Sequence, residues 1–204
     1  MRSTTGLLFF ILLSTIALGQ SSYEKLGQKA LIDGDFKLAV TNLEKAIAAD
    51  SNNVNTLYML GYSYYHAANY KKAVTTFNRL ISLKPAENSA YYYRGKARNI
   101  MGTETKNLTN LEREKLLLAS IRDFSKAIQL NTDDVKLYQN RAIAYRDYGV
   151  LKAQKIPKFY DKTKAVEAFK SCITDFQKVL EFSPGRRDIT TQLDDARIYL
   201  DNIR

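Results

Sequence analysis

The chain repeats itself at an interval of 34 residues, and this repeat limits the possible folds more than any other feature. The segments LGQKALIDGDFKLAVTNLEKAIAADSNN, from Leu26, and LGYSYYHAANYKKAVTTFNRLISLKPAE, from Leu60, align without a gap. The matching pairs are Leu26 and Leu60, Gly27 and Gly61, Phe36 and Tyr70, Ala39 and Ala73, Leu43 and Phe77, and Ile47 and Ile81. A fixed period of this length is typical of proteins in which each unit packs on the next.

Within each unit, the apolar residues have the spacing of two helices joined by a short turn. Ala73, Phe77, Leu80 and Ile81 fall at i, i+4, i+7 and i+8, which places them on one helical face. With nine glycines and three prolines in 204 residues, the chain has few of the residues that form the tight turns between strands. The pattern therefore predicts an all-α chain built of helical hairpins.

Two further units keep the same anchors but have longer middles. The repeated positions of the second helix begin at Ser120 in the third unit, 13 residues beyond the place that the 34-residue period gives. In the fourth unit they begin at Cys172, 18 residues beyond that place. Thr109 and Glu112 form a capping-box pattern, and Asp161 is a good N-cap, so each is expected to begin a long second helix. The insertions should therefore lengthen the hairpins and pack on each other.

A final helix is expected after Pro184 and Gly185. It would cover the apolar face of the last unit, because a stack of hairpins otherwise ends exposed. The residues expected to make this contact are Leu193, Ala196, Ile198 and Leu200.

The order of the anchors resembles the tetratricopeptide repeat family, whose unit carries aromatic, Leu-Gly, aromatic, alanine, large apolar, alanine and proline positions. Residues 54–87 hold most of this pattern, in the form of Leu57, Leu60, Gly61, Tyr64, Ala73, Phe77, Leu80 and Pro85. The resemblance implies an α-solenoid, a right-handed superhelix of helix-turn-helix repeats over residues 20–204. Its repeats would span about 20–53, 54–87, 88–134 and 135–186, with a capping helix at 187–204.

Residues 1–19 have the pattern of a secretory signal, with Arg2, an apolar run from Leu7 to Leu18 and a small residue, Gly19, before the expected cleavage site. The run is shorter than the roughly 20 residues of a membrane-spanning helix, so no transmembrane span is expected after cleavage. The predicted location is therefore outside the cytoplasm, periplasmic or secreted. A lone cysteine, Cys172, excludes an internal disulfide and favours a bacterial envelope. In a eukaryotic secretory pathway, Asn107 would be a glycosylation acceptor.

The chain has few residues whose pattern would favour catalysis or metal binding. Zinc sites draw three or four ligands mostly from cysteine and histidine, and the chain has only Cys172 and His66. The glycines form no phosphate-binding loop, and the carboxylate pairs Asp133-Asp134 and Asp194-Asp195 have the positions of helix-end residues. The sequence therefore predicts no enzyme, no cofactor and no metal site.

The resemblance also implies a concave groove, lined by the first helix of each repeat, that holds extended peptides. The corresponding residues are Tyr58, Tyr62, Tyr65, His66, Tyr92, Tyr93, Lys96, Asn99, Lys136, Gln139, Asn140, Ile143 and Arg146. Such a groove is aromatic at its centre and basic towards its C-terminal end, which suits a partner with acidic or aromatic side chains. Packing of some of these tyrosines against neighbouring repeats or against the inserted helices is the open alternative. Of the family's carboxylate-clamp positions, only Lys136 matches.

The predicted function is a non-catalytic scaffold that binds a partner protein or peptide during envelope or secretory assembly. A net charge of +10 leaves one alternative, an electrostatic binder of an anionic polymer or membrane surface. Export disfavours nucleic acid as the partner. The sequence does not specify an oligomeric state.

Overall fold

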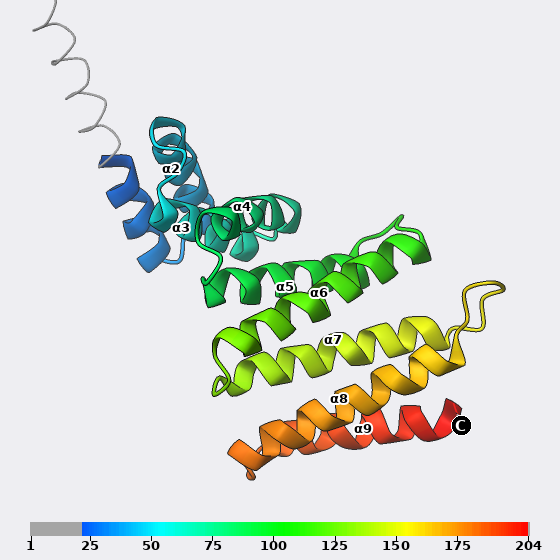
Figure 1. Cartoon of the computed structure of the whole chain (residues 1–204). Helices are drawn as coiled ribbons and strands as arrows, with labels where there is room; N and C mark the ends of the chain where they lie inside the picture. Colours follow the sequence, from blue (N-terminus) through cyan, green and yellow to red (C-terminus); the bar gives the residue numbers. More distant parts are fainter. Residues whose placement is uncertain (1–21, 204) are drawn as a thin grey trace, which may run out of the picture. The chain divides into compact units, whose positions relative to one another are not determined.

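The structure, a computed structural model, describes residues 22–203, so the predicted signal segment lies outside the described residues. Within this range the chain forms nine α-helices and no strand (Figure 1). The first helix covers residues 22–32. The others are α2 (Phe36–Ala49), α3 (Val54–His66), α4 (Tyr70–Leu83), α5 (Asn88–Glu104), α6 (Asn110–Leu130), α7 (Val135–Ala153), α8 (Lys162–Phe182) and α9 (Arg187–Ile203). The predicted all-α class is confirmed.

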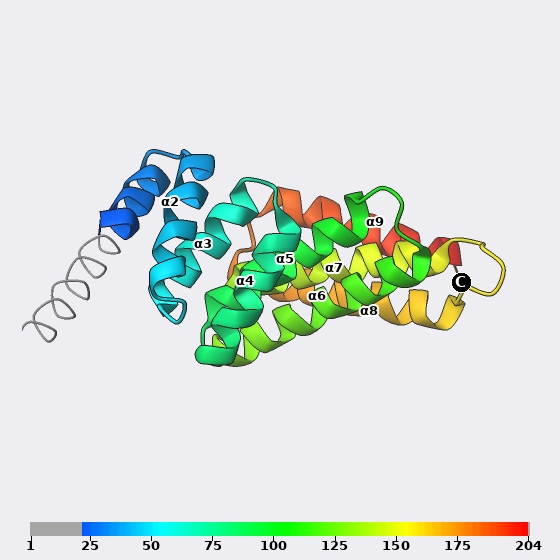
Figure 2. The ribbon, with the colours of Figure 1, turned by 90° about the horizontal axis from the view of Figure 1, so that it is seen from above.

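The chain divides into two compact units, Met1–Pro85 and Ala86–Arg204, which we call unit 1 and unit 2. In unit 1, α2 packs on α3 and α3 packs on α4. In unit 2, each helix from α5 to α9 packs on the next, as Figures 1 and 2 show. Each unit is thus built from helix-turn-helix repeats packed in sequence. No helix in residues 22–203 has the length and apolar character that crossing a membrane requires.

Side-chain caps explain where the helices begin. The Thr109 hydroxyl accepts a hydrogen bond from the Glu112 amide at 3.3 Å, and the Glu112 carboxylate accepts one from the Thr109 amide at 2.8 Å. The Asp161 carboxylate accepts a bond from the Lys164 amide at 3.0 Å. These caps begin α6 and α8, which have 21 residues each, whereas α2 and α4 have 14. The prediction that the insertions lengthen helices is confirmed.

Glycines allow the two helices of a hairpin to approach closely in unit 1. A Cβ atom added to Gly61 would lie 2.8 Å from two ring atoms of Phe77, and one added to Gly27 would lie 2.6 Å from Leu43. Both large side chains are fully buried. In both repeats, the glycine and the large apolar residue that the 34-residue alignment matched are therefore in contact between the paired helices.

The extended hairpins of unit 2 share one core. The Tyr148 hydroxyl in the lengthened part of α7 donates a hydrogen bond at 3.2 Å to Glu114 in the lengthened part of α6. Tyr148 and Leu151 also pack with Leu117, which follows the lengthened part of α6. The prediction that the extensions pack on each other is therefore confirmed. Leu117, Tyr148 and Leu151 belong to one buried cluster, which we call the extension core. Its other members are Ile121, Phe124, Ala144 and Ala168.

Helix α9 covers the last hairpin as expected, through Leu193, Ala196 and Leu200, each of which is buried. Ile198 was wrongly placed in this contact, because its side chain is 58% exposed. It lies two residues from both Ala196 and Leu200, roughly 200° around the helix from each. Ile189 in the first turn is buried instead, against the cluster that contains Cys172.

Two buried aspartates hold the hairpins of unit 2 together. Asp123 on α6 accepts hydrogen bonds from Arg94 at 2.6 Å and from Arg98 at 2.7 Å, both on α5. Asp175 on α8 accepts two bonds from Arg141 on α7, at 2.7 and 2.8 Å. Each aspartate immediately precedes the phenylalanine anchor of its helix, where unit 1 has the buried neutral residues Asn42 and Thr76. Only the lengthened repeats therefore have a charge at this buried position.

Cys172 is expected to be inert towards thiol reagents in the folded protein. Its side chain is fully buried, and this burial raises the pKa of the thiol to about 12. Because the thiolate is the reactive species, both effects suppress reaction near neutral pH. Ellman's reagent should therefore detect no thiol in the native chain and one thiol per chain in guanidinium chloride. Rapid reaction without denaturant would contradict this assignment.

Candidate functional site

The groove positions of unit 1 lie together on α3. The ring of His66 lies 4.2 Å from that of Tyr62 and 5.1 Å from that of Tyr65, centroid to centroid. Tyr58 lies one turn earlier, with its ring 6.3 Å from the ring of Tyr62. The three tyrosines are half-buried and His66 is exposed. The structure thus brings together all four residues that the sequence assigned to this part of the groove.

Phe36 completes this group and was missed by the sequence analysis. Its ring stacks on His66 with centroids 4.7 Å apart and planes 19° apart, and it lies 6.2 Å from the ring of Tyr62. The repeat alignment had matched Phe36 with Tyr70 as a helix-packing anchor, and Tyr70 does contact the edge of Tyr65. We call these six residues the aromatic cluster: Phe36, Tyr58, Tyr62, Tyr65, His66 and Tyr70. The cluster can stack with an apolar or aromatic side chain of a partner.

Tyr64, in the same stretch, has a structural role. It is buried, and its hydroxyl donates a hydrogen bond to the carboxylate of Glu44 on α2. Glu44 also pairs with Lys72 on α4 at 3.0 Å. Burial raises the pKa of Tyr64, while the bond from Tyr64 lowers the pKa of Glu44. Tyr64 therefore connects neighbouring repeats through Glu44.

The groove positions of α5 in unit 2 lie partly on the surface and partly in the core. The rings of Tyr92 and Tyr93 meet edge to face with centroids 5.0 Å apart, and the Lys96 ammonium lies 5.5 Å from the centre of the Tyr92 ring. Tyr92 also packs on the extension core, with its ring 6.2 Å from that of Phe124. Tyr92 therefore has the packing role that the sequence had left open, whereas Lys96 lies half-buried beside its ring.

Lys96 and Asn140 come together around a small hollow of about 160 Å³. Its lining residues are Lys96, Asn99 and Ile100 on α5, Phe124 on α6, and Asn140 and Ile143 on α7. The Asn140 amide donates to the backbone oxygen of Lys136 at 2.7 Å, which fixes its orientation on the helix. Lys136 itself is exposed in the first turn of α7 and does not line this hollow. Four of the positions predicted from the sequence thus form a concave surface within unit 2.

Arg146 lines a second, larger hollow of about 620 Å³. Its walls come from the ends of α5 and α7, the start of α6, and Tyr199 on α9. The lining residues are Gly102, Thr103, Asn110, Arg113, Leu117, Arg146, Asp147, Val150, Leu151, Gln154 and Tyr199. Most of them belong to the inserted segments or follow them, so the family's contact positions gave no signal for them. The lengthened hairpins therefore add a concave surface beyond the predicted positions.

Two guanidinium groups and one carboxylate determine the charge of the large hollow. Arg146 donates two hydrogen bonds to one oxygen of Asp147, at 2.9 and 3.1 Å, and Asn99 donates to the other oxygen at 2.8 Å. Asp147 thus connects α7 to α5 and neutralises much of the charge of Arg146. Arg113 instead donates to the backbone oxygens of Gly102 and Thr105, at 2.9 and 2.8 Å, where α5 ends. The hollow has a net positive lining suited to an acidic side chain.

No metal site accompanies these surfaces. In the described residues, no three His, Cys, Asp or Glu side chains lie close enough together to hold an ion. The contacts of His66 described above are with aromatic rings, and Cys172 is buried in another unit.

Comparison with known proteins identifies the type of fold. Residues 30–98 match a family model described as tetratricopeptide repeat. A crystal structure of MamA protein is 25% identical, covers 91% of this chain and 90% of that chain, and has a TM-score of 0.57. A MamA RS-1 ArsTM double mutant is 17% identical, with coverages of 91% and 86% and a TM-score of 0.67. The search of curated proteins found no match.

A thermophilic repeat protein of Thermus thermophilus, TTC0263, is also similar. It is 16% identical, the match covers 88% of this chain and 99% of that chain, and the TM-score is 0.54. Proteins with such repeats are typically non-catalytic and generally act as scaffolds for protein interaction. From its matched segment, its sequentially packed hairpins and these neighbours, the chain has the fold of a tetratricopeptide repeat protein.

Proposed function

We propose that this protein is an exported, non-catalytic scaffold that binds a segment of a partner protein on the surfaces formed by its first helices. The observation that carries the proposal is the pair of hollows in unit 2, lined by Lys96, Asn140 and Arg146 from the predicted groove positions. Concave surfaces with a few convergent polar groups are the usual form of binding sites. The proposed role is in envelope or secretory assembly.

The chemistry of the surfaces supports a partner with both acidic and aromatic or apolar side chains. Lys96 and Arg113 offer positive charge at the two hollows, and the aromatic cluster of unit 1 offers stacking surfaces. Aromatic and arginine side chains are the commonest anchors of protein interfaces. Because Tyr92 packs on Phe124, Tyr62 and Lys96 are better choices than Tyr92 for testing the surface.

The double variant Tyr62→Ala with Lys96→Ala is expected to weaken partner binding by more than roughly tenfold, because each change removes a candidate interface anchor. The partner is first captured from the native cell envelope and identified, and its affinity for each purified variant is then measured by calorimetry. Far-ultraviolet circular dichroism checks that the helical content is unchanged. The matched control is Leu83→Ala with Lys126→Ala, two exposed residues outside the cluster and both hollows. Equal affinities for the test and control variants would contradict the proposal.

A further inference from the structure

The loop between α7 and α8, residues 154–161, extends beyond the helices of unit 2 (Figure 1). Its sequence is QKIPKFYD, and its tip exposes both apolar and charged side chains. Ile156 is 37% exposed and Tyr160 is 44% exposed. Lys155, Pro157 and Lys158 are exposed as well. These five residues, which we call the loop tip, line neither of the hollows described above.

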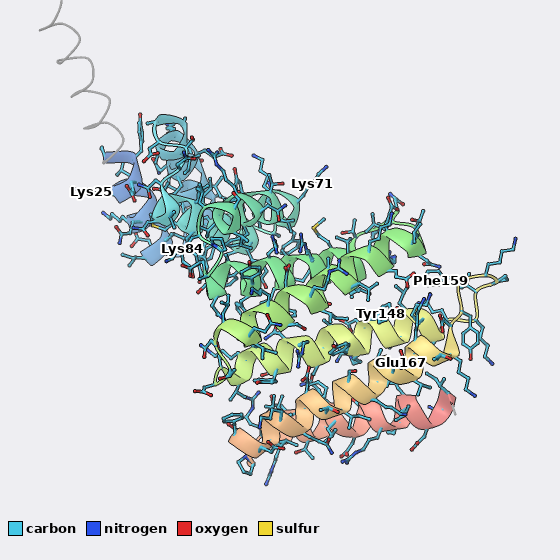
Figure 3. All side chains as sticks on the ribbon, viewed as in Figure 1. Lys25, Lys71, Lys84, Tyr148, Phe159 and Glu167 are labelled. Atoms are coloured by element: carbon cyan, nitrogen blue, oxygen red, sulfur yellow. The ribbon has the colours of Figure 1, made fainter. Side chains whose placement is uncertain are left out.

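The loop tip is held in a defined conformation. Phe159, labelled in Figure 3, is partly buried against the extension core, and the Lys152 ammonium lies 3.9 Å from the centre of its ring. The amide of Tyr160 donates to the Ile156 oxygen at 3.0 Å, and the amide of Asp161 donates to the Lys152 oxygen at 3.1 Å. Anchoring through Phe159 therefore presents the side chains on either side of it, including Ile156 and Tyr160, to the solvent.

The charge of the loop tip is positive. Asp161 is the only acid in residues 154–161, and its carboxylate both caps α8 and pairs with Lys164 at 3.3 Å. Lys152, in the last turn of α7, is buried and pairs with Glu114 at 3.6 Å. The exposed charges of the tip are thus the ammonium groups of Lys155 and Lys158.

The tip also has a shape that a headgroup can occupy. Lys155, Ile156, Pro157, Lys158 and Tyr160 line an open hollow of about 420 Å³. Two ammonium groups beside a tyrosine ring suit a phosphate group, while the isoleucine and proline side chains are apolar. Lysine and tyrosine side chains are suited to the boundary between water and hydrocarbon, because each combines an apolar body with a polar end.

We propose that the loop tip docks on a membrane surface containing anionic phospholipids. Ile156, Pro157 and Tyr160 enter the headgroup region, and Lys155 and Lys158 pair with the anionic headgroups. Apolar burial and attraction to anionic lipid together determine interfacial binding of this kind. The proposal places the charge-driven alternative from the sequence at one loop, and it does not depend on partner binding by the two hollows.

A tryptophan reporter tests the proposal directly, because the chain contains no tryptophan. In the full chain carrying Tyr160→Trp, the emission is expected to shift to the blue and to be quenched by brominated lipids when vesicles of phosphatidylcholine and phosphatidylserine are added. Vesicles of phosphatidylcholine alone should give a much smaller change. An emission spectrum that is unchanged by the anionic vesicles would overturn the proposal.

Charge reversal at the loop tip gives a second test, in which co-sedimentation measures binding to the same anionic vesicles. Each lysine near an anionic surface strengthens association roughly fivefold, so Lys155→Glu with Lys158→Glu is expected to weaken binding by at least about 25-fold. The matched control is Lys25→Glu with Lys71→Glu, which changes the net charge equally at two exposed positions of unit 1 (Figure 3). Equal losses in both variants would overturn the proposal in favour of attraction by net charge alone.

Three further outcomes are informative. If the segment from Leu7 to Leu18 bound the vesicles, binding would be the same in every variant. Vesicle binding that is unaffected by Lys155→Glu with Lys158→Glu would therefore contradict docking by the loop tip. Inorganic phosphate that shifts the tryptophan emission as fully as vesicles do would identify a phosphate site rather than a membrane contact. Tighter binding to soluble polyglutamate than to vesicles would identify an acidic protein partner instead.

Discussion

Replacing Asp123 with alanine is expected to lower the free energy of unfolding by about 3–5 kcal/mol. The carboxylate is buried and accepts hydrogen bonds from two arginines, Arg94 and Arg98. Removing it leaves two guanidinium groups in a largely desolvated position, where burial already lowers the pKa of Arg98. Urea unfolding followed by circular dichroism measures the change. We expect it in the transition that reports unit 2, because all three residues belong to that unit.

Two variants show whether the unpaired charges cause this loss. Asp195→Ala removes an exposed carboxylate from α9 and should change the stability by less than roughly 0.5 kcal/mol. Replacing Asp123, Arg94 and Arg98 together with apolar residues of similar size should recover much of the loss, because no charge then remains unpaired. If the single variant were as stable as the native chain, the buried ion pairs would have no role in holding α5 to α6.

Replacing Phe77 with alanine is expected to lower the free energy of unfolding by about 3–5 kcal/mol, chiefly through the cavity it leaves. The ring is fully buried and lies against the backbone of α3 at Gly61. Phe77 is the large apolar anchor of its repeat, so the loss should weaken the packing of α4 on α3. Thermal and urea unfolding of the variant measure the effect.

The contact with Gly61 permits a sharper test. In the native background, Gly61→Ala places a methyl group 2.8 Å from the Phe77 ring and should destabilise the chain by about 1–3 kcal/mol. In the Phe77→Ala background, the same methyl group enters the cavity and should be stabilising. A Gly61→Ala effect of the same sign and size in both backgrounds would contradict the close approach of α3 and α4.

The order of helices could be predicted from the sequence because the signals for it are either local, such as helix caps, or repeated along the chain. Hydrophobic spacing gave the helices, and the Thr109 and Asp161 caps gave the starts of α6 and α8. The repeat alignment matched Gly27 with Gly61 and Leu43 with Phe77, and the structure shows that each glycine lies against the large residue of its own repeat. Ile198 was misplaced because the apolar stripe of α9 follows Ile189, Leu193, Ala196 and Leu200, and hydrophobicity alone does not exclude an exposed neighbour.

The binding surfaces could be predicted only in part. Tyr62 and His66 lie together as the alignment implied, but Phe36, from the preceding repeat, contacts them through packing that no sequence spacing shows. The large hollow depends on where the inserted segments end, which the family pattern does not describe. The buried pairing of Asp123 with Arg94 was missed because charged residues on a helix are usually read as solvent-facing.

The shielding of Cys172 has a practical consequence for labelling this protein. A cysteine introduced at an exposed position would be the only thiol available to a maleimide dye under native conditions, so the native residue need not be removed. Dyes placed one at a time along residues 154–161 or on α3 could therefore report contact with lipid or with a partner from the otherwise unaltered chain. Because the interior of unit 2 shields Cys172, the native thiol would not react with the dye in such measurements.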